Sequence, residues 1–338
     1  MASTTSTIPA TCLAAVVKEF HKPYTLTKTP VPSPNTLSPH DILLKPGPST
    51  PRPRTHFAIG DRIIAISIRD PCGTCTDCTG PEEHRLTCKF TRGFTGISLP
   101  GVFQEYMVVD ARFSVRIPDA MGFVRAAPLT CAGSTSWRAV KRAGVRRGGW
   151  LGVVGSGGGL GHLAVQFAKK MGVNVVGVDG REVGLELSRR MGADLVVDVG
   201  VGAEALVRAV RGRVGEDGAE GERLCDAAVV LSDAPGAVHT AMMITRCHGL
   251  VVQVAQPDKV EFPFQEMIFR DIRLMGSNLS SRQELEDLVR FVEEEDVVVE
   301  TTVFRGLQSL EQVLERAHSG TVAGKIMVVV VDPEQVDE

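Results

Sequence analysis

The sequence predicts an α/β protein in which a β-rich domain is followed by a doubly wound parallel sheet. Before residue 131, short apolar runs are separated by Pro and Gly and lack helical spacing, which is typical of antiparallel β structure. From Trp150 onward, short β-branched runs alternate with segments of helical spacing, which indicates a parallel sheet with helices on both faces. A chain of 338 residues is long enough for two such domains.

The β-rich region contains several runs that we expect to form strands. Each run is short, apolar and bounded by Pro, Gly or charged residues. Between the second and third runs the chain has prolines at positions 46, 48, 51 and 53, which remove backbone donors and exclude both a helix and a central strand. The expected strands cover residues 13–17, 41–45, 61–68, 103–109 and 113–118.

In the region after Trp150, strands and helices are expected to alternate along the chain. The charged, Gly-rich segment 211–224 reads as a surface loop, and the alternation stops near residue 276. The expected strands cover residues 150–155, 173–179, 193–199, 226–232 and 249–255, and a last strand covers 325–332. The expected helices cover residues 161–172, 182–192, 203–214, 236–247, 281–295 and 307–320.

Composition and charge exclude several classes of function. A formal net charge of −3 gives no basic field for nucleic acid. No apolar run is long enough to cross a bilayer, and the N-terminus lacks a basic start followed by an apolar core. We therefore expect a cytoplasmic protein that acts on small molecules, with neither a nucleic acid nor a membrane as partner.

A glycine-rich turn in "VVGSGGGLGHLAVQFAKKMGVNVVGVD" directly follows a strand and directly precedes a helix. Its glycines allow a tight turn, close approach of a pyrophosphate and close helix–strand packing, and the helix start offers free N–H groups to phosphates. Asp179, at the end of the next strand, can accept hydrogen bonds from ribose hydroxyls and would repel a 2′-phosphate, so NAD is favoured over NADP, although Arg181 could partly offset that repulsion. The cofactor-binding residues predicted here are Gly155, Gly158, Gly159, Leu160, Gly161 and Asp179.

Four cysteines crowd into the segment "PCGTCTDCTGPEEHRLTC". In a reducing compartment such clustering indicates a metal site rather than disulfides. Four thiolates suit tetrahedral zinc, and a closed shell of four sulfurs leaves no open position for chemistry, so the expected role is structural. His84 is an alternative to the last ligand, and four free thiols are the non-functional alternative. The predicted ligands are Cys72, Cys75, Cys78 and Cys88.

The motifs "GDRI", "CGTCTDC", "AAPLTCAGSTSW" and "GSGGGLGHLAVQFAKKMG" occur in the order and approximate spacing of zinc-dependent alcohol dehydrogenases. The chain resembles most the yeast-type branch of the medium-chain dehydrogenase/reductase superfamily. The resemblance implies a GroES-like catalytic domain at residues 1–131 with a structural zinc lobe at 72–88. It also implies a Rossmann NAD-binding domain at 132–276 and a segment at 277–338 that completes the catalytic domain.

The resemblance also implies ligands and partners. It assigns the structural zinc to the four clustered cysteines, although the gap before Cys88 is two residues longer than usual. Lys325 stands where the family commonly has an arginine at the pyrophosphate. The implied cofactors are NAD and zinc, the implied substrate is an alcohol or aldehyde, and the implied assembly is a homo-oligomer, a tetramer.

A catalytic zinc is expected in this family, but most of its ligands are missing. Of the three family ligands only the last has a counterpart, Cys131, which is the one predicted catalytic residue and residual zinc ligand. The other two ligands belong between Lys45 and Gly60, where the proline-rich segment contains no cysteine and a single histidine, His56, too close to "GDRI" to match. A catalytic zinc needs about three protein ligands and an open position to polarise an alcohol. We therefore expect impaired activity.

Three functions stay open on the sequence. The first is hydride transfer between NAD and an alcohol or aldehyde, impaired by the missing ligands. The second is a zinc-independent NAD(P)H-dependent reductase of enones or quinones, which the four-cysteine lobe disfavours. The third is a non-catalytic, truncated NAD-binding protein.

Overall fold

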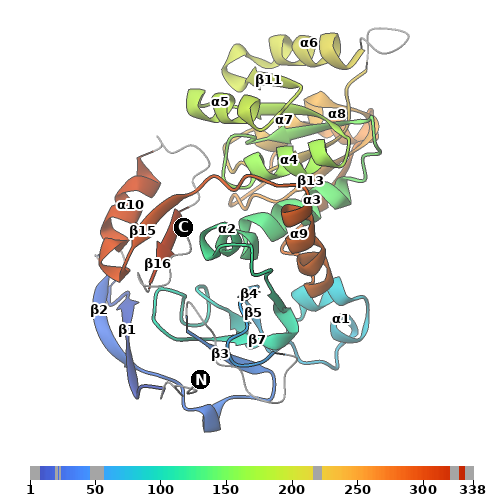
Figure 1. The fold of residues 1–338 in the computed structure, drawn as a ribbon. Helices are drawn as coiled ribbons and strands as arrows, with labels where there is room; N and C mark the ends of the chain where they lie inside the picture. The colour runs from blue at the N-terminus through green and yellow to red at the C-terminus, as the bar shows by residue number, and fades with distance from the viewer. Residues whose placement is uncertain are drawn as a thin grey trace.

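The computed structural model describes residues 8–19, 22, 24–45, 57–215, 223–319 and 327–331. Figure 1 shows a layered region of sheet and helices, with a region of short strands beside it. The chain passes from the short strands into the layered region, and after α9 (Arg282–Glu294) it returns to the short strands. Among the described residues no helix is long and apolar enough to span a bilayer.

The layered region is built on a six-stranded parallel sheet with the order β11-β10-β9-β12-β13-β14. The chain builds outward from β9 in one direction and from β12 in the other, which is the order of a Rossmann sheet. The reversal opens a crevice beyond the carboxyl ends of β9 and β12, where doubly wound sheets bind ligands. The strands are β9 (Trp150–Val154), β10 (Asn174–Asp179), β11 (Leu195–Asp198), β12 (Cys225–Val230), β13 (Thr245–Gln253) and β14 (Arg273–Gly276).

Helices cover both faces of the sheet, as predicted. Leu151 and Val153 of β9 point into a core with α3, α4 and α9. Trp150 and Val154 point into a second core with α6 and α7, because alternate side chains of a strand face opposite sides. The helices are α3 (Ala132–Ala143), α4 (Gly161–Lys170), α5 (Glu182–Arg190), α6 (Ala203–Val214), α7 (Ala237–Ile244) and α8 (Phe264–Ile268).

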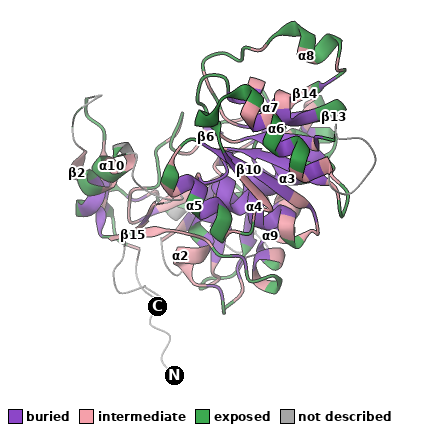
Figure 2. Ribbon diagram, turned by 90° about the horizontal axis from the view of Figure 1, so that it is seen from above, coloured by how far each residue is buried: buried purple, intermediate pink, exposed green. Residues whose placement is uncertain are grey.

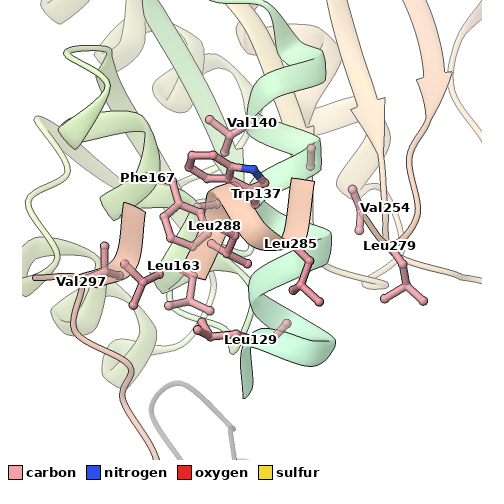
Figure 3. Close-up of a cluster of buried hydrophobic side chains, with 14 of the residues drawn as sticks. Leu129, Trp137, Val140, Leu163, Phe167, Val254, Leu279, Leu285, Leu288 and Val297 are labelled. Atoms are coloured by element: carbon pink, nitrogen blue, oxygen red, sulfur yellow. The ribbon is translucent and has the colours of Figure 1, made fainter. Parts of the chain in front are cut away.

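An aromatic cluster joins three helices in the first core (Figure 3). Trp137 of α3 packs edge-on against Phe167 of α4 with ring centroids 5.5 Å apart, and against Phe291 of α9 at 4.8 Å. Such pairs add about 0.5–1.5 kcal/mol to the burial of their area. Val297, just beyond α9, is fully buried in the same core as Leu163. α9 and the chain just after it are therefore fixed to the parallel-sheet region.

The β-rich region consists of antiparallel strand pairs, as predicted. The single strand expected over 61–68 is instead two short strands, because its two ends pair with different partners. The pairs are β1 (Thr11–Val16) with β2 (Thr25–Pro30), β3 (Asp41–Leu44) with β7 (Met107–Asp110), β4 (Ile63–Ala65) with β8 (Ser114–Arg116), and β5 (Ile68–Arg69) with β6 (Gly93–Phe94). Short helices α1 (Thr76–Thr79) and α2 (Phe123–Ala126) flank these strands.

The C-terminal part of the chain lies with the β-rich region rather than with the sheet. β15 (Thr302–Arg305) and β16 (Met327–Val330) form a parallel pair, with α10 (Leu310–His318) between them in sequence. Figures 1 and 2 both place β15 and α10 beside β2. Figure 2 also shows that buried residues concentrate in the parallel-sheet region.

Two further expectations need correction. The helix expected over 236–247 ends at Ile244, because Thr245 pairs with Cys225 and begins β13. The loop expected over 211–224 begins only after α6, and residues 216–222 lie outside the described part of the chain. β2 was not predicted from the sequence, because "TLTKTP" contains few apolar residues. In the structure its residues alternate between half-buried and exposed.

Candidate functional site

The glycine-rich turn lies at the carboxyl end of β9, at the crevice of the sheet. Gly155 has a φ of +85°, a conformation that strains any residue with a Cβ. A Cβ at Gly161 would lie 2.0 Å from the carbonyl oxygen of Gly155, so only glycine lets α4 begin this close to the strand. The backbone amides of Gly159 and Leu160 have no acceptor within the described ranges. Free amides at a helix start fit the pyrophosphate of a dinucleotide.

Asp179 ends β10 as predicted, yet its carboxylate is already hydrogen-bonded. It is 6% exposed, and its Oδ2 accepts from the backbone amide of Gly157 at 3.0 Å. Its Oδ1 accepts from the amides of Gly180 and Arg181 at 2.9 and 3.1 Å, and the Arg181 Nε lies 3.2 Å away. Asp179 therefore ties the glycine turn to β10, in addition to the ribose contact predicted for it.

A second pair of glycines, which the sequence analysis missed, supports this arrangement. A Cβ at Gly184, in the first turn of α5, would lie 2.6 Å from the Asp179 carboxyl carbon. A Cβ at Gly157 would lie 2.1 Å from the Cα of Gly184, so turn and helix touch backbone to backbone. The available signal was a glycine inside an expected helix, where it costs about 1 kcal/mol relative to alanine and therefore needs a packing reason.

Arg181 contributes an unused donor beside the ribose subsite. Its Nη1 is buried and has no hydrogen-bond acceptor in the part of the chain that the structure describes. Two other nitrogens of the same guanidinium face Asp179. A buried donor without a partner costs about 1–3 kcal/mol, which a ligand oxygen at this position would offset. The donor set fits the polar ribose end of a dinucleotide.

The four clustered cysteines come together in space. All four Sγ atoms lie within 4.8 Å of one another. The Sγ of Cys72 is 3.9 Å from that of Cys78 and 3.7 Å from that of Cys88, and the Sγ atoms of Cys75 and Cys88 are 3.8 Å apart. A tetrahedron with Zn–S bonds of about 2.3 Å has edges of about 3.8 Å. The geometry and the donor set fit a zinc ion held by four sulfurs.

The longer gap before Cys88 is absorbed by local structure. A 3-10 helix over Glu82–Thr87 carries the chain back, and Cys88 caps its end. His84, the alternative ligand, is not part of the group of four. The lobe is joined to β7 through Arg112, whose guanidinium donates to the carbonyl of Pro71 at 3.4 Å and also pairs with Asp110.

Two thiols of the cluster differ in how readily they lose a proton. Amides of Thr74 and Cys75 hydrogen-bond the Cys72 sulfur and lower its pKa to about 6. Desolvation raises the pKa of Cys78 to about 12. One sulfur thus carries negative charge readily and another resists it, so four thiolates at this distance need a metal to neutralise them.

Among the described residues, Cys131 does not lie in a group of potential metal ligands. It occupies the N-cap position of α3 and is exposed. Within the described ranges, the four cysteines of the lobe form the only group of three or more potential metal ligands, and Cys131 is not in it. Surrounding protein still desolvates its thiol and raises its pKa above the ordinary value. A single protonated thiol does not fit a catalytic zinc. The predicted residue Lys325 and the histidine that was rejected as a ligand, His56, lie outside the described residues.

An apolar cavity of about 430 Å³ opens within the β-rich region. Its walls come from β3, β4, β7, the turn that precedes α3, and β16. Of the described residues that line it, Lys45 is the only charged one, and it directly precedes the proline-rich segment.

His162 has a role that its sequence position did not reveal. It lies in the first turn of α4, its side chain is fully buried, and both ring nitrogens are hydrogen-bonded. One partner is the carbonyl of Gly158, and the other is the amide of Glu300. The second contact spans 138 positions, so no local sequence signal could show it.

Comparison with known proteins identifies the family. A profile described as "Alcohol dehydrogenase GroES-like domain" matches residues 45–119, and one described as "Zinc-binding dehydrogenase" matches residues 159–294. The chain is 32% identical to an alcohol dehydrogenase of Rhizobium meliloti (strain 1021) over 354 aligned positions, which cover 94% of this chain and 98% of that protein. The chain belongs to the zinc-type alcohol dehydrogenase family.

Two further alcohol dehydrogenases also match this chain. One from Geobacillus stearothermophilus is 32% identical over 277 residues, covering 82% of this chain and 78% of that protein. The crystal structure of the alcohol dehydrogenase from Aeropyrum pernix matches with a TM-score of 0.77 at 26% identity, covering 92% of this chain and 97% of that one. The α/β fold and the assignment to an NAD-dependent oxidoreductase family are confirmed, whereas the yeast-type branch stays a prediction.

The alignment with the Rhizobium enzyme is longer than this chain. Its 354 positions exceed the 338 residues of this alcohol dehydrogenase-family chain. That relative therefore carries residues without a counterpart here.

Proposed function

We propose that this chain binds NAD at the glycine-rich turn and one structural zinc at the cysteine lobe, while its hydride transfer between NAD and an alcohol or aldehyde is impaired. The observation that carries this proposal is the isolation of Cys131. Of the family's three catalytic zinc ligands it is the one with a counterpart, and among the described residues it belongs to no group of potential ligands.

Binding of NAD is supported by the residues at the crevice. The predicted set Gly155, Gly158, Gly159, Leu160 and Gly161 forms the turn, and Asp179 lies at the end of the neighbouring strand. The turn offers free amides to the pyrophosphate, and the Asp179 carboxylate disfavours a 2′-phosphate. We also assign Lys325 to the pyrophosphate on the family resemblance alone.

The impairment follows from the chemistry that the family's catalytic zinc supplies, which is to lower the pKa of a bound alcohol so that hydride can leave. Cys131 by itself provides one exposed thiol whose pKa is raised by desolvation. That is too few donors to hold an ion that takes about three protein ligands. The remaining residues still bind and orient the dinucleotide.

The test combines binding, metal content and turnover on the purified chain. NADH binding is followed by energy transfer from Trp137 and Trp150. We expect NADH to bind and zinc to be present at one per chain, with no turnover of short primary alcohols with NAD. Clear alcohol turnover would contradict the impairment, and absence of NADH binding would contradict the whole proposal.

A zinc-independent enone or quinone reductase is the second candidate, because Cys131 has no co-ligand within the described part of the chain and such enzymes need only a positioned nicotinamide and a proton donor. Oxidation of NADH or NADPH by enones in the presence of a chelator would support it. If NADH binds and neither assay shows turnover, the non-catalytic NAD-binding function is the one supported.

We propose the domain division 1–131, 132–276 and 277–338, in which the last segment completes the catalytic domain. The placement of β15 and α10 beside β2 supports it. We also propose a cytoplasmic location, since none of the eight cysteines is in a disulfide.

A homo-oligomer is supported by an apolar surface on α8 and the turn after it. Ile268 is 68% exposed and Phe269 is 75% exposed, with Phe264 and Met267 nearby on the same helix. This surface adjoins β14, the edge strand of the sheet. Exposed apolar patches of this kind mark interfaces, and a second copy of this chain is the occupant that the family resemblance implies. Light scattering of a Phe269→Lys variant tests it: a smaller mass than wild type is expected, and an equal mass would contradict it.

A further inference from the structure

We propose that His162 and Gln166 of α4 are positioning residues that couple the glycine-rich turn to the bridge, defined as residues 297–300, which leads from α9 to β15. This inference rests on the proposed NAD binding. The bridge is the stretch where the chain leaves the parallel-sheet region for the β-rich region, so its position sets how the two regions sit together.

His162 makes the first link. The amide of Glu300 donates to its Nε2 at 3.1 Å, which places the ring proton on Nδ1, because a backbone amide can only donate. Nδ1 then donates to the carbonyl of Gly158 at 3.1 Å. One neutral imidazole therefore connects the glycine-rich turn on one side to the bridge on the other.

Gln166, one turn further along α4, makes the second link. Its Nε2 donates to the carbonyl of Val298 at 2.8 Å, and its Oε1 accepts from the amide of Val298 at 2.9 Å. The same Nε2 also lies 3.0 Å from the carbonyl of His162. A side-chain amide that satisfies both backbone groups of Val298 substitutes for a strand partner at a place where the bridge has none.

The opposite side of the bridge is held from the β-rich region. Nη2 of Arg125, on α2, donates to the carbonyl of Val297 at 3.2 Å and to that of Val292 at 2.9 Å. Asp296, which precedes the bridge, has a φ of +47°, a strained conformation for a non-glycine residue that persists only where the surroundings hold it. Hydrogen bonds therefore hold the bridge to α2 on one side and to α4 on the other.

A ligand on the turn can act on the bridge through this arrangement. Phosphate at the turn orders the backbone around Gly158, and the Gly158 carbonyl, as acceptor for Nδ1–H, fixes the orientation of the His162 ring and reinforces the tautomer that the Glu300 amide requires. A fixed tautomer keeps the Nε2 lone pair directed at the Glu300 amide. NAD binding therefore strengthens the contacts of the bridge, without touching it.

Protonation provides a readout that a merely structural role would not give. Burial lowers the pKa of His162 below its ordinary 6.5, and the positive charge of Arg190 lowers this pKa further. The hydrogen bond to Gly158 and the negative charge of Glu300 act in the opposite direction and raise it. Arg190 and Glu300 are themselves paired at 3.2 Å. A protonated ring has no lone pair for the Glu300 amide. The link is therefore intact at neutral pH and is lost only as the pH falls through the lowered pKa of His162, below its ordinary 6.5.

The experiment uses two variants that each keep one half of the link. His162→Asn retains a donor near the Nδ1 position and loses the acceptor for Glu300, whereas His162→Gln retains an acceptor near the Nε2 position and loses the Gly158 contact. Amide hydrogen exchange of Val298 and Glu300 is measured with and without NADH, beside NADH titrations across pH 5 to 8.

In the wild type we expect NADH to slow exchange at both amides. His162→Asn should speed exchange at Glu300 and abolish the NADH effect there. His162→Gln should keep the Glu300 amide protected but lose its response to NADH, with affinity about three- to tenfold weaker and without the wild-type decline below pH 6.5. Unchanged exchange at both amides in a wild type that binds NADH would overturn the coupling. A folded wild type that fails to bind NADH at all would overturn the proposed function and the coupling with it.

Discussion

The parallel-sheet region and the β-rich region hold their site residues in place in different ways. In the former, the turn, the helix and the acid come from consecutive elements, β9, α4 and β10, and two apolar cores hold them. In the latter, strands pair two by two, and the site is a group of four sulfurs in a lobe whose one α-helix, α1, is four residues long. One site is supported by packing, and the other has the donor set of a zinc site.

Under the proposed function, this difference allows the dinucleotide site to form while the catalytic zinc site is incomplete. The glycine-rich turn is formed by β9, α4 and β10. The family resemblance places two ligands of a catalytic zinc between Lys45 and Gly60 and the third at Cys131, and of these only Cys131 is present in this chain. The dinucleotide function and the metal function are therefore separable by mutation.

The largest effect is expected from breaking the cysteine lobe. Cys75→Ser, or removal of zinc by a chelator, should unfold the lobe, because a structural zinc contributes on the order of 10 kcal/mol of binding free energy. Calorimetry should show a new low-temperature transition while NADH still binds. Cys247→Ser, at an exposed cysteine outside the lobe, is the control and should match wild type. A Cys75→Ser heat profile equal to wild type would show that the lobe does not depend on metal.

The next largest effect is expected at the glycine turn. Gly161→Ala places a Cβ against the Gly155 carbonyl, 2.0 Å away, and should abolish NADH binding and destabilise the parallel-sheet region by about 1–3 kcal/mol. Fluorescence titration and denaturant unfolding measure both. Gly212→Ala is the matched control in α6, where a Cβ meets no atom within 4 Å and alanine should stabilise by about 0.5–1 kcal/mol. Retained NADH affinity in Gly161→Ala would place the dinucleotide elsewhere.

A smaller effect is expected from Asp179→Asn. The change removes charge-assisted hydrogen bonds to Gly157 and Arg181, and it removes the repulsion of a 2′-phosphate. NADH should bind about ten- to a hundredfold more weakly, while the ratio of NADPH to NADH affinity rises. Parallel titrations with the two dinucleotides check this. An unchanged ratio of NADPH to NADH affinity would show that Asp179 does not determine the choice between the two cofactors.

The smallest effect is expected at Cys131. Cys131→Ser should leave zinc content and NADH affinity at wild-type values, because the thiol is exposed and has no co-ligand among the described residues. Metal analysis and titration test this directly. Loss of zinc in this variant alone would reveal a site that includes Cys131.

The two regions also differ in how far the sequence predicts them. Period and glycine spacing predicted β9, α4 and β10 and placed Asp179 at the right strand end, because those signals are local. The contact of His162 with Glu300 could not be predicted, because the partners are far apart in sequence. In the β-rich region the cysteine spacing indicated the cluster. β2 and the division of 61–68 into β4 and β5 depend on pairing that no run of residues encodes.

The most direct test of the account is the number of zinc ions bound per folded wild-type chain, measured by mass spectrometry under native conditions. The account predicts one zinc, which Cys75→Ser removes and Cys131→Ser does not. Two zinc ions per chain, with one lost in Cys131→Ser, would contradict it and restore a catalytic metal site.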